Sequence, residues 1–126
     1  MGSDLSRYSL YAINSDGILK WSFPTAYGDA NFSVIGPDNT IYFTDGGSLY
    51  AINPDGSEKW YCNISGTGSS LAIDSNRERV YLGTEEGKLY AISFDGVVKW
   101  SYNTALDGDR AIRGSSAIAP EGTIYF

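Results

Sequence analysis

The 126-residue chain contains no histidine, and this absence removes several kinds of catalytic site. Without imidazole there is no Ser-His-Asp triad and no Cys-His pair, and most catalytic zinc sites lose their usual ligands. The chain has one cysteine, Cys62, which excludes an internal disulfide and a multi-cysteine metal site. The sequence therefore argues against the common nucleophilic and zinc-dependent enzymes.

Long hydrophobic runs are also missing. No apolar stretch approaches the roughly 20 residues that a helix needs to cross a bilayer, so we expect no membrane insertion. The chain begins Met1-Gly2-Ser3-Asp4, without the basic and apolar regions of a signal peptide. Neither these first residues nor the composition assigns the chain to a cellular compartment.

Positive charge is scarce. There are 9 basic residues against 15 acidic ones, which gives a net charge of −6 at pH 7. Because an acidic surface repels the phosphates on which nucleic-acid affinity mostly depends, we do not expect nucleic acid as a partner. With 42% hydrophobic residues, the chain is long enough for one domain with a core and too short for two ordinary domains.

What the sequence does contain is an internal repeat. Trp21, Trp60 and Trp100 lie 39 and 40 residues apart, and the same intervals separate three Asp-Gly pairs and three copies of Leu-Tyr-Ala-Ile. A further motif, an aliphatic residue followed by Tyr and then Phe or Leu, recurs after 39 and 44 residues, at 41–43, 80–82 and 124–126. The longer step reflects an expanded loop at residues 105–113. A fixed period of this kind indicates a repeat architecture.

Each repeat divides into four short strands separated by turn residues. Residues 53–56, Asn-Pro-Asp-Gly, form a strong turn because proline presets φ and glycine accepts a positive φ. The flanking runs at residues 49–52 and 58–61 are rich in β-branched and aromatic residues and too short for helices. Several runs are apolar at consecutive positions, which indicates a sheet covered on both faces. Stacked propeller blades have such sheets.

The predicted fold is therefore all-β, made of blades of four antiparallel strands, with about three blades' worth of strands in the chain. Small residues at 33–35, 69–72 and 115–118 suit innermost strands near a propeller axis. If the strands of a blade are labelled A to D from the axis outward, the chain starts on a C strand and ends on a B strand. The predicted division is a half blade at residues 7–23, full blades at 31–62 and 69–102, and a half blade at 115–126.

Three lysines precede the three tryptophans of the repeat. They fall on the outermost strand of each blade, where a charged side chain discourages pairing with the edge of another sheet. We expect this structural role for Lys20, Lys59 and Lys99.

The pattern Gly-x-Leu-Tyr-Ala-Ile, an Asp-Gly turn and Lys-Trp, as at residues 47–60, resembles the repeat of pyrroloquinoline-quinone-like propellers. The resemblance extends over nearly the whole chain. It implies a ring of about eight four-stranded blades in which the repeated tryptophans, Trp21, Trp60 and Trp100, dock between neighbouring blades. The family includes quinoprotein dehydrogenases, a protein-binding scaffold of outer-membrane assembly and domains of unknown role. It therefore favours an exported or periplasmic location.

The resemblance also implies what a dehydrogenase of this family needs: a stacking tryptophan, a carboxylate-held Ca²⁺, a catalytic aspartate and often adjacent cysteines. None of these maps onto the chain, since the tryptophans all occupy the repeat position and Cys62 has no neighbouring cysteine. The pair Glu85-Glu86 fits a solvated hairpin turn better than a glycosidase pair. Asp107-Gly108-Asp109 lacks the later ligands of a calcium loop. We therefore predict no catalytic residue, no cofactor and no metal.

Candidate binding residues lie in loops at a mouth of the predicted channel. The loop at 105–113 joins an outer strand to the next inner one, on the face where propellers commonly bind. Its arginines suit bidentate binding of a carboxylate or phosphate, and ion pairing with its own aspartates is the alternative. The equivalent loop of the first repeat adds polar and aromatic groups. The candidates are Tyr27, Asp29, Asn31, Asp107, Asp109, Arg110 and Arg113.

Three functions remain open. A non-catalytic scaffold for protein interaction or self-assembly explains repeats without chemistry, and we favour it. A fragment of a larger quinoprotein-type dehydrogenase is the alternative, and a small-ligand or glycan-binding propeller is another, although mouth loops of unequal length argue against a repeated site.

The partner that the sequence predicts is another protein or the chain itself. Propellers usually close with roughly four to eight blades, so we expect the two half blades to pair in trans. The expected result is a head-to-tail homodimer with a twofold axis and about six blades. A trimer with about nine blades and an excised fragment of a larger propeller are the alternatives.

Overall fold

The computed structural model describes residues 8–25, 32–64, 66–104, 111–112 and 116–126. These residues form twelve short strands and no α-helix, which confirms the all-β prediction. In this part of the chain no helix is long and apolar enough to span a membrane. The strands are β1 (Tyr8–Ile13), β2 (Leu19–Thr25), β3 (Ser33–Ile35), β4 (Ile41–Asp45), β5 (Ser48–Ile52), β6 (Glu58–Asn63), β7 (Gly68–Asp74), β8 (Arg79–Thr84), β9 (Lys88–Ser93), β10 (Val98–Asn103), β11 (Ala117–Ile118) and β12 (Ile124–Tyr125).

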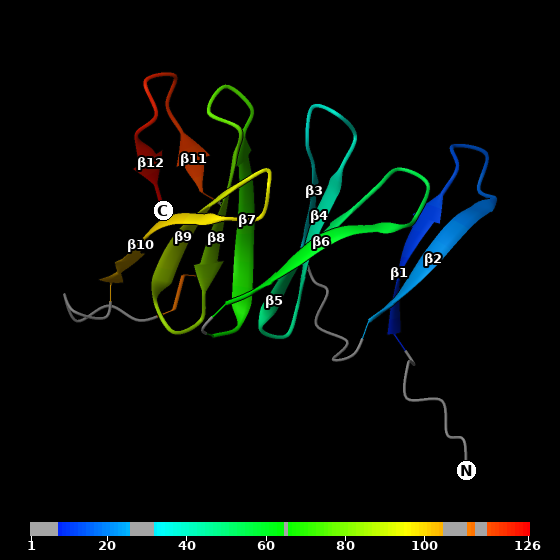
Figure 1. Ribbon diagram of the computed structural model, residues 1–126, viewed down its shortest axis with the longest axis horizontal. Helices are drawn as coiled ribbons and strands as arrows, with labels where there is room; N and C mark the ends of the chain where they lie inside the picture. The colour runs from blue at the N-terminus through cyan, green and yellow to red at the C-terminus, as the bar shows by residue number, and fades with distance from the viewer. Residues whose placement is uncertain (1–7, 26–31, 65, 105–110, 113–115) are drawn as a thin grey trace, which may run out of the picture.

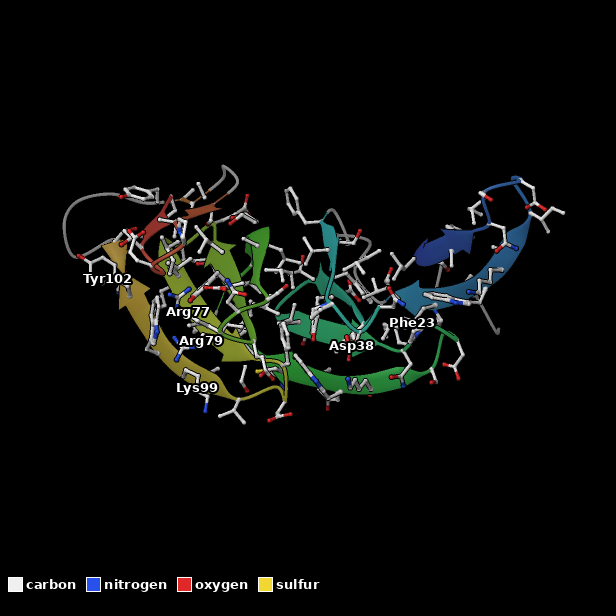
Figure 2. The ribbon with its side chains drawn as sticks, turned by 90° about the horizontal axis from the view of Figure 1, so that it is seen from above. Phe23, Asp38, Arg77, Arg79, Lys99 and Tyr102 are labelled. Atoms are coloured by element: carbon white, nitrogen blue, oxygen red, sulfur yellow. The ribbon has the colours of Figure 1, made fainter. Side chains whose placement is uncertain are left out.

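The strands form four antiparallel sheets that follow one another along the chain. Two sheets have four strands, in the orders β3-β4-β5-β6 and β7-β8-β9-β10, and two have two strands, β1-β2 and β11-β12. The sheets stand side by side in an open arc, with β1-β2 at one end and β11-β12 at the other (Figures 1 and 2). The predicted four-stranded blades are present, and the arc is a part of a propeller.

Asp-Gly turns join the two outer strands of each blade, between β1 and β2, β5 and β6, and β9 and β10. Gly17, Gly56 and Gly96 have φ values of +87°, +94° and +88°, a region that favours glycine. In the middle turn, the backbone N–H of Asn53 donates to the carbonyl of Ser57 at 2.8 Å. The same geometry in three turns gives each blade the same outer hairpin.

The main core lies between the two complete blades. Within β5, Leu49 and Ala51 face the next blade, and they are fully buried among its apolar side chains. Tyr50, between them, faces the preceding sheet, where its ring lies 5.8 Å from that of Phe23. This alternation follows from the pleat of a strand, and it explains why consecutive positions are apolar.

Each two-stranded sheet packs against a complete blade. The sheet β11-β12 places Ile118 and Ile124 against the cluster formed by Tyr81, Leu89 and Ala91. Its turn is held by Arg77, which donates to the carbonyl of Pro120 at 3.2 Å and pairs with Asp74 at 2.9 Å. The inner turn of one blade thereby supports the inner turn of the next.

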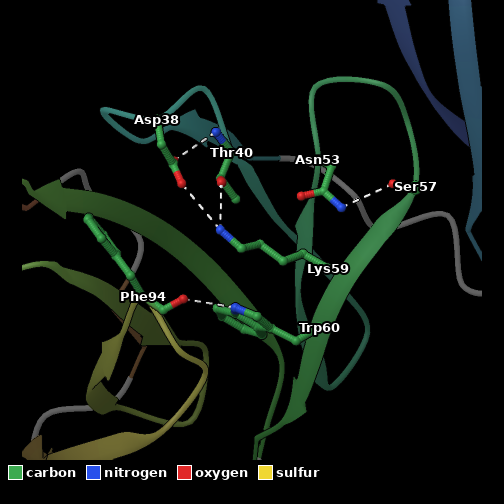
Figure 3. A network of polar contacts seen from close by, with 7 residues as sticks. All are labelled: Asp38, Thr40, Asn53, Ser57, Lys59, Trp60 and Phe94. Carbon is green, nitrogen blue, oxygen red and sulfur yellow. Dashed lines mark hydrogen bonds and ion pairs between the residues drawn. The ribbon is translucent and has the colours of Figure 1, made fainter.

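The outer-strand lysine of the first complete blade forms an ion pair within its own blade. The ammonium of Lys59 lies 3.2 Å from a carboxylate oxygen of Asp38 and 3.3 Å from the hydroxyl of Thr40 (Figure 3). The same carboxylate also accepts the backbone N–H of Thr40 at 3.1 Å. Hydrogen bonds from Thr40, and then the charge of Lys59, lower the pKa of Asp38 from 3.8 to about 2.

This lowered pKa predicts a particular acid dependence. The ionised form of Asp38 is favoured in the folded state, so its contribution to stability is present above pH 3.8 and is lost as the pH falls towards 2. Asp38→Asn should remove this part of the pH dependence and cost less than about 1 kcal/mol at pH 7, because the pair is largely exposed. The measurement is the free energy of unfolding of both proteins between pH 7 and pH 2.

Lys59→Met is the matched control for Asp38→Asn. It should retain most of the pH dependence, because the hydrogen bonds from Thr40 are the larger cause of the shift. If wild-type protein and Asp38→Asn lose stability in parallel from pH 4 to pH 2, the described contacts of Asp38 are wrong.

Candidate interaction surfaces

Two of the three tryptophans, Trp21 and Trp60, connect an outer strand to the following blade. The indole N–H of Trp21 donates to the carbonyl of Pro54 at 2.9 Å. The indole N–H of Trp60 donates to the carbonyl of Phe94, also at 2.9 Å (Figure 3). In both cases the acceptor lies in the Asp-Gly turn of the next sheet along the chain. The indole therefore connects neighbouring blades by one hydrogen bond and by the packing of its ring.

In these two contacts the ring that covers the turn leaves room only for glycine. A Cβ atom on Gly56 would lie 2.8 Å from the ring of Trp21, and one on Gly96 would lie 2.9 Å from the ring of Trp60. These distances are shorter than Cβ contacts allow, and the positive φ already disfavours a side chain. The Asp-Gly motif thus serves both the turn and the contact between blades.

The third tryptophan and the first turn do not make this contact. Trp100 packs on Tyr81 of its own blade, with ring centroids 5.8 Å apart, and remains 38% exposed. A Cβ atom on Gly17 would meet nothing within 4 Å among the described residues. Trp100 is therefore an indole without a turn glycine beneath it, and Gly17 is a turn glycine without an indole above it, among the described residues.

Three aromatic rings meet where β1-β2 packs on the first complete blade. The ring of Phe23 lies 5.9 Å from that of Phe43 and 5.8 Å from that of Tyr50, and the latter two rings stack at 5.2 Å. Each such pair contributes about 0.5 to 1.5 kcal/mol beyond its buried area. This trio shows how an outer strand of one blade contacts the two middle strands of the next.

At the other end of the arc, the position equivalent to this aromatic cluster is an open groove. This C-terminal groove has a volume of about 470 Å³ and is lined by Leu89, Trp100, Tyr102, Ile124 and Phe126. Tyr102 follows Trp100 by two residues, as Phe23 follows Trp21, and Phe126 ends the same motif as Phe43. Tyr102 and Phe126 are each 52% exposed.

A second groove, the N-terminal groove, lies beside β1. Its volume is about 510 Å³, and it is lined by residues of β1, of β2 and of the inner strands β3 and β4 of the first complete blade. Both neighbouring sheets contribute to its walls. The lining includes Tyr11, Ile13, Trp21, Ile35, Ile41 and Pro54.

Equivalent residues are buried in the complete blades and exposed at these two ends. Tyr42 and Tyr81 are 0% and 2% exposed, whereas Tyr125, at the same position of the repeat, is 62% exposed. At another repeat position Tyr90 is 7% exposed and Tyr50 is half-buried, whereas Tyr11 is 61% exposed. Since the residue type and the local strand are the same, the difference comes from the number of described strands that lie beside each residue.

The loop residues that the sequence predicted as a binding site lie outside the described residues. These are Tyr27, Asp29, Asn31, Asp107, Asp109, Arg110 and Arg113. The groove residues were not predicted as a site, because they match the repeat and therefore look like core positions. The sequence feature that could have indicated them is the position of the first and last repeat motifs along the chain. Among the described strands, these motifs form the two-stranded sheets, in which β1 and β12 have one strand neighbour each.

The acidic pair and the cysteine have local structural contacts. Glu86 accepts the backbone N–H of Thr67 at 2.7 Å, so it fixes the neighbouring loop. Cys62 is half-buried, which raises the pKa of its thiol, and its thiol donates to the carbonyl of Asn63 at 3.6 Å. Within the described ranges no group of three or more acidic or cysteine side chains is placed to hold a metal ion.

The sequence over residues 6–126 matches the family model described as outer membrane protein assembly factor BamB, a pyrroloquinoline-quinone-like propeller family. The chain belongs to this family. No curated protein matches it.

Two solved structures share the fold. BamB from Moraxella catarrhalis is 19% identical with a TM-score of 0.74, and the alignment covers 91% of this chain and 39% of that one. A protein of unknown function from Bacteroides caccae is 16% identical with a TM-score of 0.71, covering 93% of this chain and 45% of that one. The chain thus spans less than half the length of these propeller structures.

Truncating the central tryptophan tests the contact between blades. Trp60→Ala should lower the free energy of unfolding by about 3 to 5 kcal/mol, because the large ring and its hydrogen bond are both lost. Trp60→Phe should cost less, since it keeps a ring and loses only the N–H donor. Chemical denaturation followed by circular dichroism measures both.

The control for these variants is Tyr61→Ala on the same strand. Tyr61 is 56% exposed and stacks only on Tyr50 among the described aromatic contacts, so its loss should cost about 1.5 kcal/mol or less. Equal midpoints for wild type and Trp60→Ala would contradict the assigned role of Trp60.

Proposed function

We propose that this chain is a non-catalytic propeller scaffold that acts through contacts with protein. The observation that carries the proposal is the match of residues 6–126 to the family described as an outer membrane protein assembly factor. Large apolar side chains are also exposed on the described surface, among them Tyr11 and Ile35 at the N-terminal groove. Clustered exposed apolar side chains mark interaction surfaces. The two grooves beside them are lined mainly by aromatic and aliphatic side chains, as protein-binding sites are.

Family membership supports the same proposal. The family model is described as an outer membrane protein assembly factor, a role that depends on contacts rather than on catalysis. Identities of 16% and 19% to the solved structures carry the fold alone, so the assembly role is a proposal for this chain. A periplasmic or exported location fits it.

A quinoprotein-type dehydrogenase fragment is the alternative, because the wider family contains such enzymes. Purified protein should show no alcohol oxidation when the quinone and Ca²⁺ are added, since no set of residues matching that site is present in the sequence. A dye-linked oxidation assay measures this, with a known quinoprotein as positive control. Quinone-dependent turnover would overturn the scaffold proposal in favour of the enzyme. A small-ligand or glycan-binding propeller has no described residue in its favour.

The first partner that we propose is a second copy of the chain. Strands β1 and β12 each pair with one neighbour among the described strands. Joining β11-β12 of one copy to β1-β2 of another restores the strand order of a complete blade. Two copies related by a twofold axis then close a ring of about six blades.

The mass in solution tests this homodimer. Light scattering should give roughly twice the chain mass of 13.7 kDa. Deleting residues 123–126 should abolish the dimer, because one strand is removed from each shared blade. Deleting residues 1–4, which precede the family match, should leave the dimer intact. A stable monomer of the undeleted chain would contradict the dimer.

A further inference from the structure

Three basic side chains gather on the second complete blade of this acidic chain. We infer that Arg77, Arg79 and Lys99 form a binding site for an acidic segment of a partner protein, whose carboxylate takes the position that Asp38 has in the first complete blade. The inference rests on the proposed function, a scaffold that acts through contacts with protein, and it adds a surface and a class of partner. The residues that carry it belong to the two complete blades, β3-β4-β5-β6 and β7-β8-β9-β10.

The two complete blades share the geometry of their inner turn, which joins the first two strands. Each of these turns contains a non-glycine residue with positive φ, Asn39 at +68° in the first blade and Glu78 at +55° in the second. The residue directly before it is Asp38 in the first blade and Arg77 in the second. A cation therefore stands in the second blade at the position of an anion in the first.

The outer-strand lysines are equivalent as well. Lys59 and Lys99 each lie in the bulge of the outer hairpin, directly before the tryptophan that pairs with an alanine of the middle strand. In the first blade this position brings the ammonium of Lys59 to 3.3 Å from the hydroxyl of Thr40. Arg79 precedes the motif at 80–82 as Thr40 precedes that at 41–43, so the shared register places Lys99 beside Arg79 (Figure 2).

The first blade shows which group these positions bind. The carboxylate of Asp38 lies 3.2 Å from the ammonium of Lys59 and accepts the backbone N–H of Thr40 at 3.1 Å. The edge of the first blade thus contains its own counter-ion. The equivalent edge of the second blade has three of the nine basic residues of the chain and no carboxylate at the position of Asp38.

The three cations differ in how their charge is used. Arg77 donates to Asp74 at 2.9 Å and to the carbonyl of Pro120 at 3.2 Å, which holds its guanidinium in place. A guanidinium has five N–H donors, so others remain for a ligand, and this side chain is 33% exposed. Among the described residues, Arg79 and Lys99 form no ion pair. Arg79 is half-buried and Lys99 is exposed.

Two acidic side chains of the same turn reduce the positive charge of this site without cancelling it. Asp74 is buried and paired with Arg77. Glu78 is exposed and forms no ion pair in the described part of the chain, so it is the internal competitor for a ligand carboxylate. One positive charge remains in excess after both are counted.

This edge stays open beside a complete neighbouring blade. The side chains of Asp38 and Lys59 are 56% and 37% exposed, although a complete blade follows theirs. The outer turn of that following blade contains Asp95, and the described ion pair of Lys59 is with Asp38 instead. A neighbouring blade therefore neither covers this edge nor supplies its counter-ion.

An acidic protein segment fits the site better than a polyanion or an anionic membrane. The chain has a net charge of −6, which repels an extended negative surface, whereas a short segment meets only the local cations. The group at the equivalent position of the first blade is a carboxylate. Arginine also suits a carboxylate, because its planar fork binds both oxygens.

Binding of a labelled peptide tests the site. The probe is the peptide Gly-Ser-Glu-Asp-Glu-Ser-Gly, and its neutral counterpart is Gly-Ser-Gln-Asn-Gln-Ser-Gly. Fluorescence anisotropy at low ionic strength should show at least about fivefold tighter binding of the acidic peptide, and salt should weaken it. Equal binding of the two peptides, or no binding of either, would overturn the inference.

Substitutions then locate the binding. Arg79→Gln and Lys99→Gln should each weaken binding of the acidic peptide about threefold, and the double variant about tenfold, as expected for partly exposed ion pairs. The matched control is the double variant Lys20→Gln and Lys88→Gln, which removes the same charge elsewhere and should change the dissociation constant less than about twofold. Equal losses in the two double variants would show attraction by net charge alone and would contradict the site.

A carboxylate introduced into the turn should block the site from within. Arg77→Asp restores the arrangement of the first blade, in which the turn carboxylate occupies the lysine. Arg77→Gln loses the same contacts to Asp74 and Pro120 without adding an anion. Arg77→Asp should therefore weaken peptide binding at least about threefold more than Arg77→Gln. Equal effects would show that the position of Asp38 is not where the ligand binds.

Vesicles of phosphatidylglycerol distinguish a membrane surface from a protein segment. Wild-type protein should bind the acidic peptide and should not sediment with the vesicles. Sedimentation that depends on Arg79 and Lys99, without binding of the peptide, would assign the site to lipid and overturn the inference.

The outcomes are separate from those that test the proposed function. If peptide binding does not depend on Arg79 and Lys99, this site is wrong and the scaffold proposal stands. If the protein shows quinone-dependent turnover, the scaffold proposal fails whatever the peptide does.

Discussion

The contact on which the structure depends is an indole ring lying over the glycine of the next blade's Asp-Gly turn. Trp21 on Gly56 and Trp60 on Gly96 fix the spacing of successive sheets, since neither glycine has room for a Cβ atom. Each indole also satisfies a turn carbonyl in the neighbouring blade. Because both contacts join one blade to the following one, they set the order in which successive blades pack.

A directional contact of this kind leaves different surfaces at the two ends of an arc. One end presents Trp100 and the C-terminal groove, and the other presents Gly17 and the N-terminal groove. The proposed homodimer joins these surfaces, since the chain's own blade contacts are built from the same repeat. The proposed assembly function follows from this repetition of one contact and needs no catalytic group.

The sequence was sufficient to predict the all-β fold and its blades, because tryptophan, Asp-Gly and the Leu-Tyr-Ala-Ile strand recur together. It was not sufficient to predict the grooves. Tyr11, Tyr102 and Phe126 match positions that are buried in complete blades, so their composition indicates core, and their exposure depends on which strands are present beside them. The pairing of Lys59 with Asp38 also escaped prediction, because it joins an outer strand to an inner turn. The predicted loop site lies outside the described residues.

Hydrogen exchange at the free edge of β1 tests the central claim most directly, that blade halves of separate copies pair. Backbone N–H groups of β1 that point away from β2 have no strand partner in the described part of one chain. The account predicts slow exchange of these amides at high protein concentration and fast exchange on dilution, with β5 protected throughout. Fast exchange along this edge of β1 at every concentration would contradict it.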